Sequence, residues 1–176
     1  KNEKYFMNEI ENQNLLNTKY PKNIPKIKTY FKDKNKDGNK TYLYIIMDYL
    51  KNYITLDTYL QNNKDSKDNH IILLKKIITF VEKMNKDKYI HGDLHPKNIM
   101  INKTGTKFYL IDFGFSVNFN IKNSINLNNI PKDLINTFDK YVLTANLYYN
   151  KYKINDNTIR ILLMPNIDNV FIEYSI

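Results

Sequence analysis

The sequence predicts a single domain of mixed α+β structure, and three stretches carry this prediction. Residues 71–84 place apolar side chains at steps of three and four, the period of an amphipathic helix. Residues 41–47 (TYLYIIM) are aromatic and β-branched, which is typical of a strand. Residues 99–101 and 108–111 flank a turn that contains Gly105, as the two strands of a hairpin do. With 176 residues, the chain can bury one core.

The first fifty residues predict one helix and two strands. A helix is expected over residues 3–18, because Pro21 enforces a stop and the apolar residues approximate one face. These apolar residues are Phe6, Ile10, Leu15 and Leu16. A short strand, 27–31, is followed by the polar run 32–40, which signals a turn. The strand 41–47 is then expected to be buried on both faces.

The middle of the chain predicts two helices. Thr55 can cap a short helix that ends near residue 61. The second helix contains 71–84 and ends near Lys88. Further apolar residues widen its apolar stripe and predict burial on more than one side. These are Ile72, Leu73, Ile77 and Phe80.

The last third of the chain is less regular. Residues 115–129 are rich in Asn and show little period. Pro131 suits the first turn of a helix that runs to about residue 152. Its expected apolar face consists of Leu134, Phe138, Tyr141, Val142, Ala145 and Tyr148. A final helix over 156–164 and an apolar tail, 166–176, complete the prediction.

The net charge of +9 raises the question of a nucleic-acid partner. The positive charges are lysines scattered through every segment, and Arg160 is the single arginine. Base readout and bidentate phosphate contacts favour arginine, whose planar fork lysine cannot reproduce. The composition therefore does not predict a nucleic-acid function.

The chain contains no cysteine, which excludes disulfides and cysteine-based zinc sites and favours an intracellular, cytoplasmic protein. No apolar run approaches the ~20 residues that span a bilayer, so no membrane partner is expected. The sequence begins inside a helical pattern without an initiator Met, and we expect it to be a fragment. Nothing in the pattern indicates an oligomeric state.

The most informative stretch is 91–98 (HGDLHPKN), with Asp112 following it after the hairpin. Asp93, Asn98 and Asp112 are two carboxylates and an amide that the hairpin spaces rigidly. Such hard oxygen donors suit a divalent cation and the phosphates that it accompanies. The spacing therefore predicts a metal and phosphate site.

These residues resemble the protein-kinase-like fold. The kinase catalytic loop has His, any residue, Asp, and then Asn five residues after the Asp, which His91, Asp93 and Asn98 reproduce. Residues 112–114 match the DFG element letter for letter. The resemblance implies a partial N-lobe and hinge in residues 1–50 and a mainly helical C-lobe in 51–176, within one kinase-like domain, 1–176.

The resemblance also extends upstream of the hairpin. The helix 3–18 looks like the kinase αC helix, whose ion-pair glutamate would be Glu11, with Glu9 as the rival. The strand 41–47 looks like the strand that leads to the adenine-binding hinge. On that alignment Met47 is the gatekeeper. The backbone of Asp48, Tyr49 and Leu50 would contact adenine.

The resemblance implies ATP and Mg²⁺ as cofactors and gives each loop residue a role. Asp112 would hold Mg²⁺, with Asn98 as the second protein ligand. Asp93 would accept the proton of the attacking hydroxyl. Lys97 or His95 would lie near the transferring phosphate. His91 is expected to be structural, and Asp139 to anchor the loop from the following helix.

The sequence departs from ordinary protein kinases in three ways. It shows no Gly-rich loop and no strand lysine before the αC-like helix, so weak or no activity is expected from this fragment alone. Gly92 replaces the arginine that commonly pairs with a phosphorylated activation loop. His95 replaces a Lys or Arg, which resembles aminoglycoside and choline kinases. The segment after Gly114 also lacks an Ala-Pro-Glu motif.

The sequence therefore predicts an ATP- and Mg²⁺-dependent phosphotransferase that acts on a hydroxyl-bearing substrate. A Ser/Thr-type protein kinase is the leading prediction. The alternatives are a small-molecule kinase of the aminoglycoside or choline kinase type, and a pseudokinase that only binds.

Overall fold

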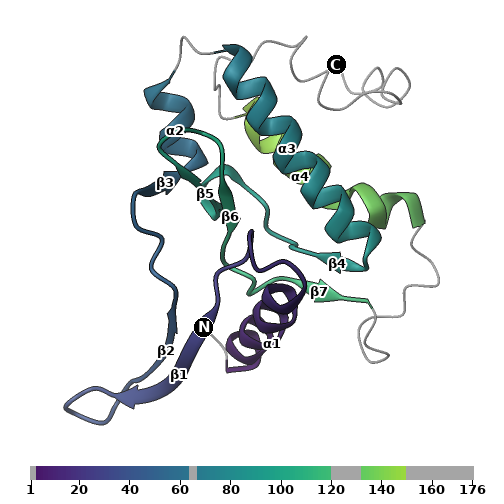
Figure 1. Cartoon of the computed structure of the whole chain (residues 1–176). Helices are drawn as coiled ribbons and strands as arrows, with labels where there is room; N and C mark the ends of the chain where they lie inside the picture. Colours follow the sequence, from purple (N-terminus) through teal and green to yellow (C-terminus); the bar gives the residue numbers. More distant parts are fainter. Residues whose placement is uncertain (1–2, 64–66, 120–131, 150–176) are drawn as a thin grey trace.

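The computed structural model describes residues 3–63, 67–119 and 132–149 (Figure 1). The helices are α1 (Glu3–Lys19), α2 (Leu56–Asn62), α3 (Lys67–Lys86), the 3-10 turn η1 (Pro96–Asn98) and α4 (Lys132–Tyr149). The strands are β1 (Ile27–Lys34), β2 (Thr41–Met47), β3 (Tyr53–Thr55), β4 (Tyr89–Ile90), β5 (Ile99–Asn102), β6 (Phe108–Leu110) and β7 (Val117–Asn118). The predicted α+β class is confirmed.

Antiparallel pairs build three small sheets: β1 with β2, β3 with β5 and β6, and β4 with β7. The hairpin predicted after residues 91–98 is confirmed, and its register pairs Ile99 with Leu110. The segment expected to be irregular contains β7, whose Val117 pairs with Ile90. Strands β4 and β7 were not predicted, because a strand of two residues is too short to show a period.

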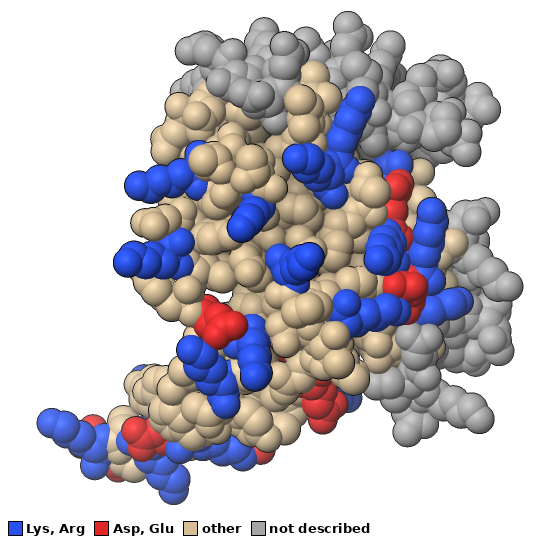
Figure 2. Space-filling model, in the orientation of Figure 1, with Lys and Arg blue, Asp and Glu red and all other residues tan. Residues whose placement is uncertain are grey.

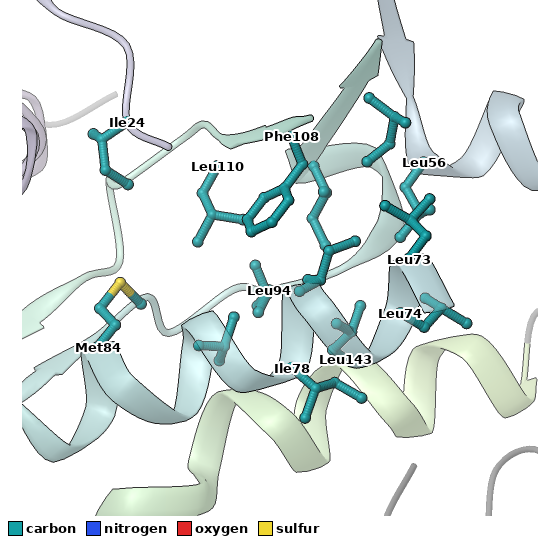
Figure 3. Packing of buried hydrophobic residues seen from close by; sticks show 14 of the residues in the cluster. Ile24, Leu56, Leu73, Leu74, Ile78, Met84, Leu94, Phe108, Leu110 and Leu143 are labelled. Carbon is teal, nitrogen blue, oxygen red and sulfur yellow. The ribbon is translucent and has the colours of Figure 1, made fainter. Parts of the chain in front are cut away.

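The main hydrophobic core lies where α3, α4, α2 and the β5–β6 hairpin meet (Figure 3). Helices α3 and α4 run side by side, and Leu143 of α4 packs into this core (Figure 1). Leu94 of the catalytic loop and Leu110 of β6 are fully buried in the same cluster. Each such side chain contributes about 1.5–3 kcal/mol through its burial. The loop that carries the candidate site therefore rests directly on the core.

The structure corrects the predicted apolar faces of three helices. In α1, Leu15 is exposed, whereas polar Asn12 and Gln13 are buried. In α3, Ile72 is exposed. In α4, Ala145 is exposed, and Ile135, Leu143 and Leu147 are buried. The side chains of Leu134 and Tyr148 lie outside the described ones. The α1 prediction failed because amides that bond to carbonyls occupy part of its buried face, which a count of apolar residues cannot detect.

The β1–β2 ribbon also differs from the prediction. Strand β2 was expected to be buried on both faces, but its side chains alternate between half-buried and exposed. Leu43, Ile45 and Met47 pack against α1, whereas Tyr44 and Ile46 are exposed. Aromatic and β-branched residues favour any pleated strand, so composition alone did not reveal that α1 covers one face only.

Two local predictions are confirmed, and two others concern residues that the structure does not describe. The Thr55 hydroxyl accepts a hydrogen bond from the Thr58 amide and caps α2. Gly38 and Gly105 lie in the two hairpin turns with positive φ. The predicted helix 156–164 and the tail 166–176 lie outside the described residues. No helix in the described part of the chain has the length and apolar character to cross a membrane.

Candidate active site

The catalytic loop, residues 91–98, is anchored by a buried carboxylate of α4. Asp139 is fully buried, and its oxygens accept the amide hydrogens of His91 (2.7 Å) and Gly92 (3.0 Å). The Asn85 side chain donates to the same carboxylate at 2.7 Å. Three donors offset the cost of burying a carboxylate. The predicted anchoring role of Asp139 is confirmed.

His91 joins this loop to the end of β6. Its Nε2 lies 3.0 Å from the carbonyl oxygen of Ile111, and because that oxygen can only accept, Nε2 carries the hydrogen. Burial lowers the pKa of His91, although the Asp139 carboxylate partly opposes this. The imidazole is therefore neutral near pH 7, and its ring packs on Phe113. These contacts support the structural role that the sequence predicted.

The other loop residues are folded back on one another. The amides of His95 and Asn98 donate to the carbonyls of Asp93 (3.2 Å) and His95 (2.9 Å), and these bonds turn the chain into η1. The Asn98 side chain donates to the Asp93 carbonyl at 3.0 Å. His95 Nε2 lies 3.8 Å from an Asp93 carboxylate oxygen. Lys97 is exposed. Asp93 itself is partly exposed, so a substrate hydroxyl could reach it.

Asp112 lies at the same end of the hairpin as Asn98. The Ile111 amide donates to the Asn98 carbonyl at 3.0 Å, which places the two candidate metal ligands on adjoining backbone. Asp112 has φ +65°, a left-handed conformation that costs a non-glycine residue of the order of 1 kcal/mol or more and that gathers at functional sites. The Asn98 amide nitrogen is engaged, which leaves its Oδ1 as the atom that could coordinate.

This donor set fits Mg²⁺. Among the described residues, no group of three or more His, Cys, Asp or Glu side chains could hold a metal ion. Mg²⁺ does not require such a cage, because it is commonly bound by one or two carboxylates together with waters and substrate phosphates. The Asp112 carboxylate and the Asn98 amide oxygen are hard donors of this kind.

The hinge-like segment leaves the sheet where the sequence predicted. The Asp48 amide donates to the Lys26 carbonyl at 2.9 Å, and Tyr49 is 86% exposed. Met47 is half-buried against α1, and its sulfur lies 3.8 Å from the Gln13 amide nitrogen. Contact of Asp48, Tyr49 or Leu50 with adenine stays a prediction.

The structure separates the two candidate glutamates of α1. Glu9 is buried, whereas Glu11 is exposed. Residues two apart on a helix lie about 200° apart around its axis, so both cannot face the interior. Glu9 therefore lies on the inward face of α1 and Glu11 on the exposed face. Which of the two is the ion-pair glutamate stays a prediction.

Sequence reasoning missed two further residues of α1, Asn8 and Asn12. Their side-chain amides donate to backbone carbonyls of the segment that follows Asp112. The only available signal was their spacing of four, which places both on one helical face.

Lysines dominate the charge around this fold. Figure 2 shows them spread across the visible face and along the β1–β2 ribbon, interrupted by a few carboxylates. Several are already paired, such as Lys19 with Asp87 and Lys140 with Glu82. The positive charge is distributed over this face and does not gather in one patch.

A carboxylate-bearing loop, a hairpin and a second carboxylate at its end define a site that resembles those of kinases. Comparison with known families agrees, because residues 1–146 match the protein kinase domain. The chain belongs to the protein kinase family.

The chain is similar to several named kinases. It is 30% identical to Citron Rho-interacting kinase of Homo sapiens over 118 residues, which are 66% of this chain and 5% of that protein. It is 35% identical over 78 residues, 44% of this chain, to the serine/threonine-protein kinase CBK1 of Pneumocystis carinii. A probable serine/threonine-protein kinase of Dictyostelium discoideum, fnkB, is 31% identical over 86 residues, 48% of this chain. The chain spans 15% and 16% of the last two proteins.

Proposed function

We propose that this protein transfers the γ-phosphate of ATP to a hydroxyl group, with Mg²⁺ as cofactor, as a Ser/Thr-type protein kinase. The observation that carries the proposal is the placement of Asp93 and Asp112. The former lies on a partly exposed loop, and the latter lies at the hairpin end beside Asn98. The similarity to serine/threonine kinases supports a protein substrate. We also propose the cytoplasmic location that the composition favours.

Each residue has a defined task in this proposal. Asp93 accepts the proton of the attacking hydroxyl and orients that group in line with the phosphate. Asp112 and Asn98 would hold Mg²⁺, which neutralises charge on the phosphates when bound. His95, close to the Asp93 carboxylate, and exposed Lys97 supply positive or hydrogen-bonding groups near the transferred phosphate. Glu11, with Glu9 as the rival, takes the place of the αC-like glutamate.

A small-molecule acceptor is the second candidate. The motif GDLHP at residues 92–96 favours it, because it resembles that of aminoglycoside and choline kinases. The absence of an Ala-Pro-Glu motif between Gly114 and Pro131 in the sequence also favours it. A binding role without turnover is the third candidate, and measured ADP release distinguishes it from the two enzyme candidates.

The experiment uses the full-length protein and measures Mg²⁺-ATP binding and ADP release for the wild type, Asp93→Ala and Asp112→Ala. We expect Asp112→Ala to abolish the Mg²⁺-dependent part of nucleotide binding. Asp93→Ala should retain binding and lose turnover by about 10²-fold or more. Asp33→Ala, on the exposed ribbon, is the matched control.

The pattern of results separates the candidates. Binding without measurable ADP release in the wild type would support the binding role. Turnover that survives Asp93→Ala or Asp112→Ala would overturn the proposed site. Comparing generic protein substrates with aminoglycosides and choline as phosphate acceptors then distinguishes the two enzyme candidates.

A further inference from the structure

The turn formed by residues 113–116 connects the candidate metal ligand Asp112 to β7. The Ser116 amide and hydroxyl both donate to the Phe113 carbonyl, at 3.1 and 2.5 Å. Phe113 and Ser116 are buried, whereas Phe115 is 59% exposed. The position of Asp112 therefore depends on what holds this turn.

On one side, two asparagines of α1 hold the turn. The Asn8 amide nitrogen lies 3.0 Å from the Ser116 carbonyl and 3.4 Å from the Gly114 carbonyl. The Asn12 amide nitrogen donates to the same Ser116 carbonyl at 3.1 Å and to the Asn8 side-chain oxygen at 3.0 Å. Figure 1 shows α1 beside the β7 strand that this turn enters. We call these bonds the amide latch.

On the other side, the turn lies against the catalytic loop at Gly92. A Cβ atom built at this position would lie 2.4 Å from the Phe115 carbonyl oxygen, closer than real atoms approach. Gly92 also has φ +82°, which side chains rarely tolerate. No larger residue fits here while the turn is closed. The turn therefore occupies the space that a side chain at position 92 would need, and a charged side chain cannot fit there.

We propose that Asn8 and Asn12 are positioning residues that hold the 113–116 turn, and through it Asp112, against the catalytic loop. The inference rests on the proposed function for its catalytic consequence only. The latch consists of neutral amide-to-carbonyl bonds, so it closes the turn without an added charge such as a phosphate group. Asn12 is 4% exposed, which shields its bonds from competing water.

Hydrogen exchange tests the latch without any need for activity. Asn8→Ala, Asn12→Ala and the double variant are compared with wild type over the peptide 113–118. Each lost bond of this kind corresponds to a factor of about 2–10, so the double variant should exchange about tenfold or more faster there. Asn8 is half-buried, so the single variant Asn8→Ala remains informative if the others unfold.

Asn17→Ala is the matched control. Asn17 is on the same helix, and its side chain donates to the Ile24 carbonyl at 2.7 Å, at the opposite end of α1. Its loss should raise exchange near residue 24 and leave 113–118 unchanged. Unchanged exchange over 113–118 in Asn8→Ala and Asn12→Ala, or an equal rise there in Asn17→Ala, would overturn the proposal.

A second experiment measures enzyme kinetics and tests whether the turn acts through Asp112. Asn8→Ala should lower kcat severalfold with little change in the KM for ATP, and it should raise the Mg²⁺ concentration needed for half-maximal rate. Extra Mg²⁺ should therefore restore part of the rate, which a merely structural role would not allow. Faster exchange with an unchanged Mg²⁺ requirement would refute the positioning role. If the full-length wild type shows no turnover, the proposed function fails while the exchange result still decides the latch.

Discussion

The catalytic loop carries Asp93 and the β1–β2 ribbon leads into the predicted hinge, but the two are held by different forces. The loop rests on fully buried Leu94 and Phe113, and a buried carboxylate fixes its backbone. The ribbon has α1 on one face, while its other face leaves Phe31 and Tyr44 44% and 41% exposed. The two rings stack on each other with centroids 4.9 Å apart.

This difference indicates where the fold determines function. The core of the described residues fixes the geometry of Asp93 and Asp112, because their loop and hairpin are part of that core. The predicted hinge follows β2, so its position depends on a half-covered ribbon. Chemistry at the two carboxylates should therefore tolerate changes in the ribbon much better than changes in the core.

The largest expected difference comes from a matched pair of phenylalanines. Phe113→Ala should lower the free energy of unfolding by about 3–5 kcal/mol, because it leaves a cavity in a closed core. Phe31→Ala should cost about 1 kcal/mol or less, because its ring is already partly hydrated. Urea unfolding midpoints measure both. Equal losses would contradict the contrast drawn here.

The second test concerns the loop anchor. Asp139→Asn keeps the shape of the side chain but turns an NH₂ group toward amide hydrogens that need an acceptor. A buried donor left unsatisfied beside a lost charge-assisted bond should cost about 2–4 kcal/mol. Thermal unfolding measures this loss.

Asp33→Asn is the control for the anchor. Asp33 lies on the exposed ribbon and accepts a hydrogen bond from the Lys34 amide at 2.8 Å. Its change should stay within about 0.5 kcal/mol. If both variants lose the same stability, the carboxylate of Asp139 is not the anchor that its contacts indicate.

The sequence predicted the candidate site and the long helices better than it predicted the packing between elements. The carboxylates were found because kinase chemistry restricts the residue types at 93, 98 and 112 and the hairpin fixes their spacing. The family followed from the same residues, and the α+β class followed from the patterns of 41–47, 71–84 and the hairpin. Long helices such as α3 were also predicted, since their period extends over many turns.

The rest depended on contacts that a linear pattern does not contain. Nothing near Leu15 shows that α1 buries amides on its inner face and leaves this leucine exposed. The short strand β7 is defined by its partner Ile90, far away in sequence. The burial of Glu9 and the exposure of Glu11 also depend on which side of α1 faces inward. Such features arise from tertiary packing, which overrides local preference.

The smallest expected effect is a dependence of stability on pH near the loop. Burial lowers the pKa of His91 and of His70 below their ordinary value. The unfolded chain therefore binds protons more readily than the folded one, and acid favours unfolding. The stabilising contribution is complete above pH ~6.5 and is lost as the pH falls toward the folded pKa. Each histidine can contribute a slope of at most about 1.4 kcal/mol per pH unit.

Unfolding free energies between pH 5 and pH 8 measure this slope for wild type, His91→Gln and His70→Gln. Each variant should lose part of the slope, whatever its stability at pH 8. The carboxylates of Asp139, Asp112 and Asp93 raise the pKa of His91 and so oppose its burial. Replacing Asp139 should therefore lower the pKa of His91 further, provided that the loop keeps its structure. The stabilising contribution of His91 would then be lost over a range that extends to lower pH. An unchanged slope in His91→Gln would show that other groups govern the acid sensitivity. The loop histidine would then be less desolvated in solution than its complete burial implies.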